Sequence, residues 1–165
     1  MTTTTVAVDA FLCDGIEAVG GKLYSLGIGW NSISAPAFPA RHPRIGIGVL
    51  IHVPYTATNL MHEFLVHIQS EDGEVIPLGE AVPGSDPRTV EGGRVVRLGG
   101  QFNVGRPPEL PPGDEQLVPI GFQVDGVQFP APGRYEVVVE VDGRPEARLS
   151  FRVVQVHQLQ VQIPA

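Results

Sequence analysis

Hydrophobic and polar residues alternate along most of the chain, which is the pattern of β-strands. The alternation is cleanest at 45–53 and 135–141, where every second residue is large and apolar. Successive side chains of a strand point to opposite faces, so a period of two gives each segment one apolar face. No stretch keeps the helical period of about 3.6 residues. The chain is therefore predicted to be all-β.

The same alternation predicts further short strands at residues 6–13, 22–30, 60–69, 75–78, 94–104, 117–124, 127–129, 149–153 and 155–163. In segment 22–30, one face carries the large apolar residues Tyr24, Leu26, Ile28 and Trp30. If the strands are layered, a shared interior is predicted to bring together Trp30, Ile47, Val137 and Phe151.

Asp-Gly pairs mark several breaks between these segments, at 72–73, 125–126 and 142–143. Such pairs suit two-residue hairpin turns, because glycine adopts positive φ freely and aspartate tolerates it. Eight or nine short strands joined by such turns predict an antiparallel two-sheet sandwich of the immunoglobulin-like type, with a closed β-barrel as the alternative. Tyr135 fits a tyrosine corner, since it follows a Pro-Gly bend and begins a strand.

With 165 residues, the chain is long enough for one domain with a sizeable core. Residues 1–165 are predicted to form a single β-sandwich. Stretches rich in proline, glycine or small polar residues predict connectors near 35–43, 79–93 and 105–114.

The net charge of −7 argues against a nucleic-acid partner, because phosphates would be repelled. The densest basic stretch is diluted by acidic residues and is interpreted as a solvated edge rather than an anion site; its arginines are Arg88, Arg94, Arg97 and Arg106. A single cysteine excludes an intrachain disulfide. The N-terminus lacks a signal-peptide pattern, and the longest apolar stretch is too short to cross a membrane. The predicted location is the cytoplasm.

Short motifs spread over most of the chain resemble a family of uncharacterised bacterial proteins common in actinobacteria. They are Val8-Asp9-Ala10 to Cys13-Asp14, Gly21-Lys22-Leu23-Tyr24 to Gly29-Trp30, Val53-Pro54-Tyr55 to Asn59 and His62, and Pro132-Gly133-Arg134-Tyr135 to Val141-Asp142-Gly143. The resemblance implies an expectation about the fold and none about an activity.

Histidines suggest a metal hypothesis, with His52, His62 and His67 as candidate ligands. If strands 45–53 and 60–69 pair, the buried faces favour a register with His52 opposite Glu63. His62 then points into the core, whereas the other two lie on the opposite face. No carboxylate or cysteine completes a ligand set, so no metal site is predicted. A metal-binding protein or metal-dependent enzyme stays as an alternative.

Other chemistry is less favoured. Cys13 lies in an apolar strand, where a thiol is usually an inert small side chain. No serine has a nucleophile-elbow pattern, and the Gly-x-Gly pairs lack the strand-to-helix context of a phosphate loop. Neither catalytic residues nor a cofactor are therefore predicted.

Glycines on two predicted strands suggest a bare sheet face, formed by Gly27 and Gly29 with Gly46 and Gly48. Glycine within a strand often marks close approach by another backbone or a ligand. If the strands are neighbours, their bare face forms a shallow trough. Either the chain's own loop 79–93 or a partner is then expected to fill this trough. The run 155–163, with Leu159 and Val161, is a second candidate contact, because an alternating segment can add to another sheet edge.

These patterns favour a non-enzymatic binding or scaffolding module that contacts a protein partner or itself, and a homo-oligomer is one expected outcome. Besides the metal-binding alternative, a further hypothesis is that the chain is a structural subunit of a larger assembly, joined through edge strands.

Overall fold

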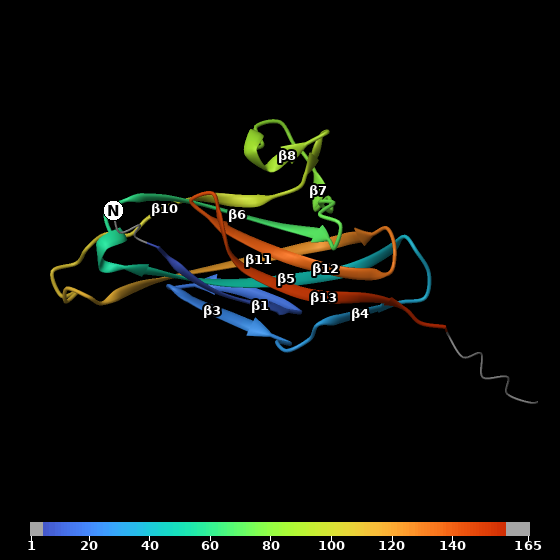
Figure 1. Ribbon diagram of the computed structural model, residues 1–165, viewed down its shortest axis with the longest axis horizontal. Coiled ribbons are helices and arrows are strands. Elements are labelled where there is room, and N and C mark those ends of the chain that lie inside the picture. Colours follow the sequence, from blue (N-terminus) through green and yellow to red (C-terminus); the bar gives the residue numbers. More distant parts are fainter. Residues whose placement is uncertain (1–4, 158–165) are drawn as a thin grey trace, which may run out of the picture.

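The computed structural model describes residues 5–157, and two main β-sheets face each other across a hydrophobic core (Figure 1). The three-stranded sheet has the order β1 (Ala7–Cys13), β5 (Ala40–Pro54) and β11 (Glu115–Phe129). The five-stranded sheet has the order β10 (Leu98–Asn103), β6 (Met61–Ser70), β12 (Gly133–Val141), β13 (Arg144–Gln155) and β4 (Ser32–Ala35).

Two smaller sheets complete the architecture. A hairpin consists of β2 (Gly15–Val19) and β3 (Lys22–Leu26). A second small sheet has the order β7 (Gly79–Glu80), β9 (Arg94–Val95) and β8 (Val90–Glu91). Two 3-10 turns, η1 (Tyr55–Ala57) and η2 (Pro87–Thr89), are the helical elements of the described residues. The predicted all-β class is confirmed.

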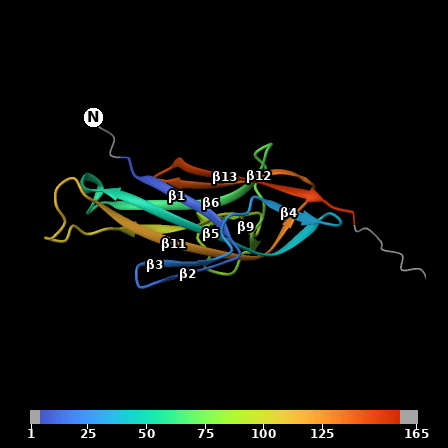
Figure 2. The ribbon, with the colours of Figure 1, turned by 90° about the horizontal axis from the view of Figure 1, so that it is seen from below.

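The hairpin lies outside the three-stranded sheet, on the side away from β12 and β13 (Figure 2). Along one side of the molecule β1 lies against β13, so the two main sheets curl toward each other there. On the other side, β11 and β10 are the outermost strands of their sheets. The small β7–β9–β8 sheet projects beyond β6 (Figure 1).

The core forms where the alternating apolar faces of the two sheets meet. All five inward residues of β5 are at most 1% exposed: Ile45, Ile47, Val49, Ile51 and Val53. Ile47, Val137 and Phe151 belong to one buried cluster, and Trp30 packs against it with its ring 6.3 Å from that of Phe151. The predicted shared interior is confirmed.

Two of the three Asp-Gly predictions hold. Asp142 and Gly143 have φ values of 50° and 77° and join β12 to β13, which is the positive-φ hairpin turn expected for this pair. Asp72-Gly73 lies in the turn that follows β6. After this turn, Val75 forms an antiparallel bridge with Gln69 of β6.

The third prediction is wrong, because Asp125-Gly126 lies within β11. Asp125 pairs with Arg44 and Val127 with His42, so the ladder continues through the pair. The partner strand β5 is 15 residues long and extends past this point, which keeps β11 in the sheet. The predicted strands 117–124 and 127–129 are therefore one strand.

The predicted strand 22–30 is shorter than expected. It ends at Leu26, and Tyr24, Leu26 and Ile28 are exposed rather than buried. The Gly20-Gly21 turn, where both residues have positive φ, folds residues 15–26 into a hairpin, and the positive φ of Gly27 ends the second strand of that hairpin. Its opposite face, carrying Leu23, is the one that lies against the sheet.

The predicted pairing of 45–53 with 60–69 is also wrong. These strands are β5 and β6, which belong to different sheets and already have two neighbours each. The residues between them, which include η1, carry the chain from one sheet to the other.

Three boundaries differ further from expectation. Segment 94–104 contains two strands, β9 and β10, and the connector 79–93 contains β7, η2 and β8. The connector near 35–43 is shorter, because β5 begins at Ala40. Residues 105–114 have no strand, as expected. The last run, 155–163, begins at the end of β13, and its candidates Leu159 and Val161 lie outside the described residues.

Candidate functional site

The glycine face of β5 is closed by neighbouring side chains. Gly48 pairs with Phe11 and Gly46 with Cys13 on the adjacent strand β1. A Cβ atom at either glycine would collide with the side chain of its partner. Glycine is required here so that Phe11 and Cys13 can lie across the sheet surface.

The hairpin extends this cover to β11. A Cβ atom on Gly121 would lie 3.2 Å from Ile16 and 3.5 Å from Leu23, the inward residues of β2 and β3. The face around Gly46 and Gly48 is thus covered by the chain itself, but by Phe11 and Cys13 of β1 rather than by loop 79–93, and the hairpin covers Gly121 beside it. Gly27 and Gly29 follow the end of β3 with positive φ and do not border Gly46 or Gly48.

The outer face of the hairpin is strongly apolar. Tyr24, Leu26 and Ile28 are 58%, 78% and 59% exposed, and Val19 at the hairpin turn is 50% exposed. We call these four residues the hairpin patch. Exposed large apolar residues occur elsewhere in the described chain, but nowhere else are so many this close in sequence. Exposed large apolar residues that gather in one part of the surface mark interaction sites.

The structure separates the three candidate histidine ligands. His52 lies on the outer face of the three-stranded sheet, His62 is buried, and His67 is buried on the opposite face of β6 from His62. Within residues 5–157, no three side chains of the metal-binding types are grouped so that they could hold an ion.

His62 occupies the inward position predicted for it and is held at both ring nitrogens. Nδ1 lies 2.8 Å from Asp142 Oδ2, and Nε2 lies 2.9 Å from the Ala57 carbonyl oxygen. The ring also stacks on Phe102, with centroids 5.1 Å apart. Burial lowers the pKa of His62, but the two hydrogen bonds raise it more, so the net pKa is above the ordinary value. The imidazolium fits this site because both neighbours are acceptors.

Asp142 has a second role as a turn residue. Its other carboxylate oxygen accepts a hydrogen bond of 3.0 Å from the Glu63 backbone N–H, and its own N–H donates to the Glu63 carbonyl. The β12–β13 turn is therefore fixed to the start of β6. This cluster is structural.

His52 is held between two carboxylates from the flanking strands. Nδ1 lies 2.6 Å from Glu115 Oε1 on β11, and Nε2 lies 2.8 Å from Asp9 Oδ2 on β1. The hydrogen bonds to Glu115 and Asp9 raise the pKa of His52. The protonated ring thus links all three strands of this sheet.

Replacing His52 with glutamine is expected to destabilise the protein by about 0.5–1 kcal/mol at acidic pH, since both carboxylates are largely exposed. The folded pKa is raised, so the contribution is complete below the unfolded value of about 6.5 and is lost as pH rises through the folded pKa. Urea unfolding of both proteins from acidic to alkaline pH measures this. A stability difference that stays constant with pH would contradict the ion-pair account.

His67 and Cys13 offer no reactive arrangement. His67 Nε2 lies 2.9 Å from Gln69 Oε1, and its Nδ1 is buried without a hydrogen-bond partner. Burial raises the pKa of the Cys13 thiol, which keeps it protonated and unreactive.

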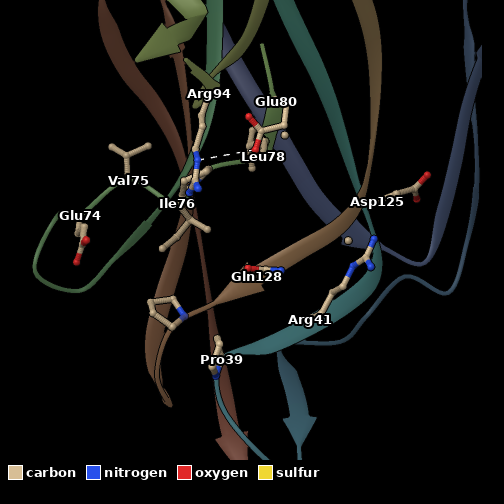
Figure 3. A pocket seen from close by; sticks show the side chains of 14 residues that line it. Pro39, Arg41, Glu74, Val75, Ile76, Leu78, Glu80, Arg94, Asp125 and Gln128 are labelled. Atoms are coloured by element: carbon tan, nitrogen blue, oxygen red, sulfur yellow. Dashed lines mark ion pairs between the residues drawn. The ribbon is translucent and has the colours of Figure 1, made fainter. Parts of the chain in front are cut away.

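A cleft opens between the end of the three-stranded sheet and segment 74–80, and its volume is about 750 Å³ (Figure 3). Arg41 and Gln128 come from β5 and β11, while Glu80 and Arg94 come from the small β7–β9–β8 sheet on the opposite wall. The alternation pattern gave no signal for this cleft, because its walls come together only through tertiary contacts.

The structure defines an all-β domain of several sheets, in which the polar clusters around His52 and His62 connect neighbouring strands and turns. Residues 8–154 match a family of unknown function, DUF6941, and the chain belongs to this family. The expected resemblance to an uncharacterised family is confirmed to that extent; the actinobacterial source stays a prediction.

The remaining comparisons add no function. No curated protein matches the chain. The solved structure of Pseudomonas fluorescens alkylpurine DNA glycosylase AlkC, bound to DNA containing an abasic site analog, is similar at 12% sequence identity and a TM-score of 0.39. The match covers 92% of this chain but spans only 30% of that one, and a likeness this weak carries no argument. Among residues 5–157, no helix is long and apolar enough to span a membrane.

Proposed function

We propose that this chain is a non-enzymatic protein-binding module and that the hairpin patch is its contact surface. The observation that carries the proposal is the exposure of Tyr24 and Leu26 on the outer face of a hairpin and of Ile28 just after it. These side chains add nothing to the chain's own core, because Ile16 and Leu23 make the contacts to the sheet beneath.

The composition of the patch favours a protein over a small ligand. It lies on a protruding surface rather than in a cleft, and it combines aliphatic side chains with a tyrosine. Tyrosine is among the residues that most often dominate the binding energy of protein interfaces, and the aliphatic side chains beside it add apolar area. Glu17 lies opposite Tyr24 and Lys22 opposite Val19 on the same hairpin face, so the patch also offers one charge of each sign to a partner.

Replacing Leu26 and Ile28 together with serine tests this function. The double variant is expected to bind its partner at least a hundredfold more weakly, because burying each aliphatic side chain contributes about 1.5–3 kcal/mol. A photoreactive benzoylphenylalanine at position 24 of the full chain identifies the contact in a lysate of the native cells. Sedimentation velocity of the purified protein reports whether the partner is a second copy.

The matched control replaces Val82 and Met61 with serine. These residues are 67% and 63% exposed and lie after β7 and on β6, strands of other sheets than the hairpin. This control should cross-link from position 24 as strongly as the wild type. Both double variants should unfold at nearly the same urea concentration as the wild type, since surface changes have small effects. Equal cross-linking by the hairpin variant would refute the proposed contact surface.

Two finer assignments belong to the same proposal. The sandwich is of the immunoglobulin-like type; its support is the Tyr135 hydroxyl, which donates to the Ala131 carbonyl at 2.6 Å, four residues upstream, as in a tyrosine corner. The location is the cytoplasm, supported by the single, buried cysteine.

A further inference from the structure

The cleft between β11 and segment 74–80 contains a guanidinium group with no protein partner. In the described part of the chain, the Arg41 side chain makes no hydrogen bond or ion pair with another residue. A guanidinium has five N–H donors arranged for planar oxygen pairs such as carboxylate or phosphate. Arg41 therefore has its full donor capacity available in the cleft (Figure 3).

The backbone of β11 is shaped around this side chain. Gly126 has a φ of 69°, and a Cβ atom there would lie 2.6 Å from Arg41 Nη2. The positive φ calls for glycine here, and the guanidinium occupies the space that its missing side chain leaves. This accounts for an Asp-Gly pair in the interior of a strand, where it forms no turn.

The neighbouring carboxylate does not neutralise Arg41. Asp125 is bound instead by Arg44, whose Nε lies 2.6 Å from Asp125 Oδ1, and this hydrogen bond lowers the pKa of Asp125. Because that carboxylate is already paired, Arg41 keeps an unmatched positive charge on its wall of the cleft.

The opposite wall carries both signs of charge. Arg94 Nε lies 3.9 Å from Glu80 Oε1, longer than the 2.7–2.9 Å typical of a direct charge-assisted hydrogen bond. Glu74 also lines this wall. A negative group is therefore favoured beside Arg41 and Gln128, while the half-buried side chains of Val75 and Leu78 face the carbon skeleton of a ligand.

We propose that this cleft binds a small organic anion and that Arg41 holds its carboxylate or phosphate group. The volume of about 750 Å³ lies within the range of about 300–1,000 Å³ typical of small-ligand sites. This site is separate from the hairpin patch and does not depend on it.

The test is an NMR titration of the ¹⁵N-labelled full chain. The probes are glutarate and glycerol 3-phosphate, which distinguish a carboxylate from a phosphate ligand, with glycerol as the uncharged comparison. At least one anion is expected to give saturable shifts of three signals: the Gly126 amide, the Gln128 amide and the Arg41 Nε–H group. Glycerol is expected to shift none of them.

Arg41→Gln should weaken that binding at least tenfold, because a charge-assisted bidentate contact is lost. Arg144→Gln is the matched control: Arg144 is an exposed arginine on β13, without an ion pair among the described residues and outside the cleft. It should bind like the wild type. The proposal is overturned if neither anion gives a saturable shift at these amides, or if Arg41→Gln binds as tightly as the wild type.

Discussion

Replacing Phe151 with alanine is expected to lower the free energy of unfolding by about 3–5 kcal/mol, the range for deleting a buried aromatic side chain. Phe151 is 1% exposed and lies at the centre of an aromatic cluster. Its ring centroid is 5.8 Å from that of Phe129 and 6.0 Å from that of Tyr135. Truncation leaves a cavity between the sheets that these rigid rings fill poorly. Urea unfolding at neutral pH measures the change.

The neighbouring residue supplies the control. Arg152 is on the same strand but exposed, so Arg152→Ala should change stability by no more than about 0.5 kcal/mol. Phe151→Leu keeps part of the side-chain volume, so its loss in free energy of unfolding should fall between those of Phe151→Ala and Arg152→Ala. A loss below about 1 kcal/mol in Phe151→Ala would mean that the sheets do not meet at this position.

Replacing Asp142 with asparagine is expected to destabilise the protein by about 1.5–3 kcal/mol at acidic pH, the range for losing a hydrogen bond to a charged group. Asparagine tolerates the positive φ of this turn position, so the change isolates the carboxylate charge from the turn geometry. The buried His62 ring then loses its counter-charge.

The pH dependence identifies the cause. The folded pKa of His62 is raised, so its ion pair stabilises the protein fully below an unfolded pKa of about 6.5. That contribution disappears as pH rises through the folded pKa. The difference between the wild type and Asp142→Asn should therefore be largest in acid and shrink at alkaline pH, measured by urea unfolding across this range.

Asp72→Asn is the matched control for the second prediction. Asp72 also precedes glycine in a turn, but no hydrogen bond or ion pair involves its side chain among residues 5–157. Its replacement should leave stability unchanged and independent of pH. A pH-independent loss in Asp142→Asn would assign the effect to the turn instead of the ion pair.

The alternation pattern predicted the buried strands well for a physical reason. In β5 and β12, one face packs against the opposite sheet, so period two and burial coincide. The pattern failed at 22–30, where the more apolar face points outward and the hairpin lies against the sheet through its other face. Local sequence shows that two faces differ, but the tertiary arrangement decides which one is covered.

The candidate sites show the same limit. The inward position of His62 follows from alternation alone, but its partner Asp142 is 80 residues away. The same holds for His52, whose carboxylates lie 43 and 63 residues away on flanking strands. The cleft joins segments that only the sheet order brings together. Spacing along the chain carries no signal for such sites.

The β2–β3 hairpin has a consequence for how this family can diversify. Its inward side chains are constrained, since Ile16 and Leu23 fit over Gly121 with little space to spare. Its outward side chains Tyr24 and Leu26 are mostly exposed. Substitutions at Tyr24 or Leu26 should therefore cost little stability, and on the contact surface proposed above they would change the partner without rebuilding the scaffold.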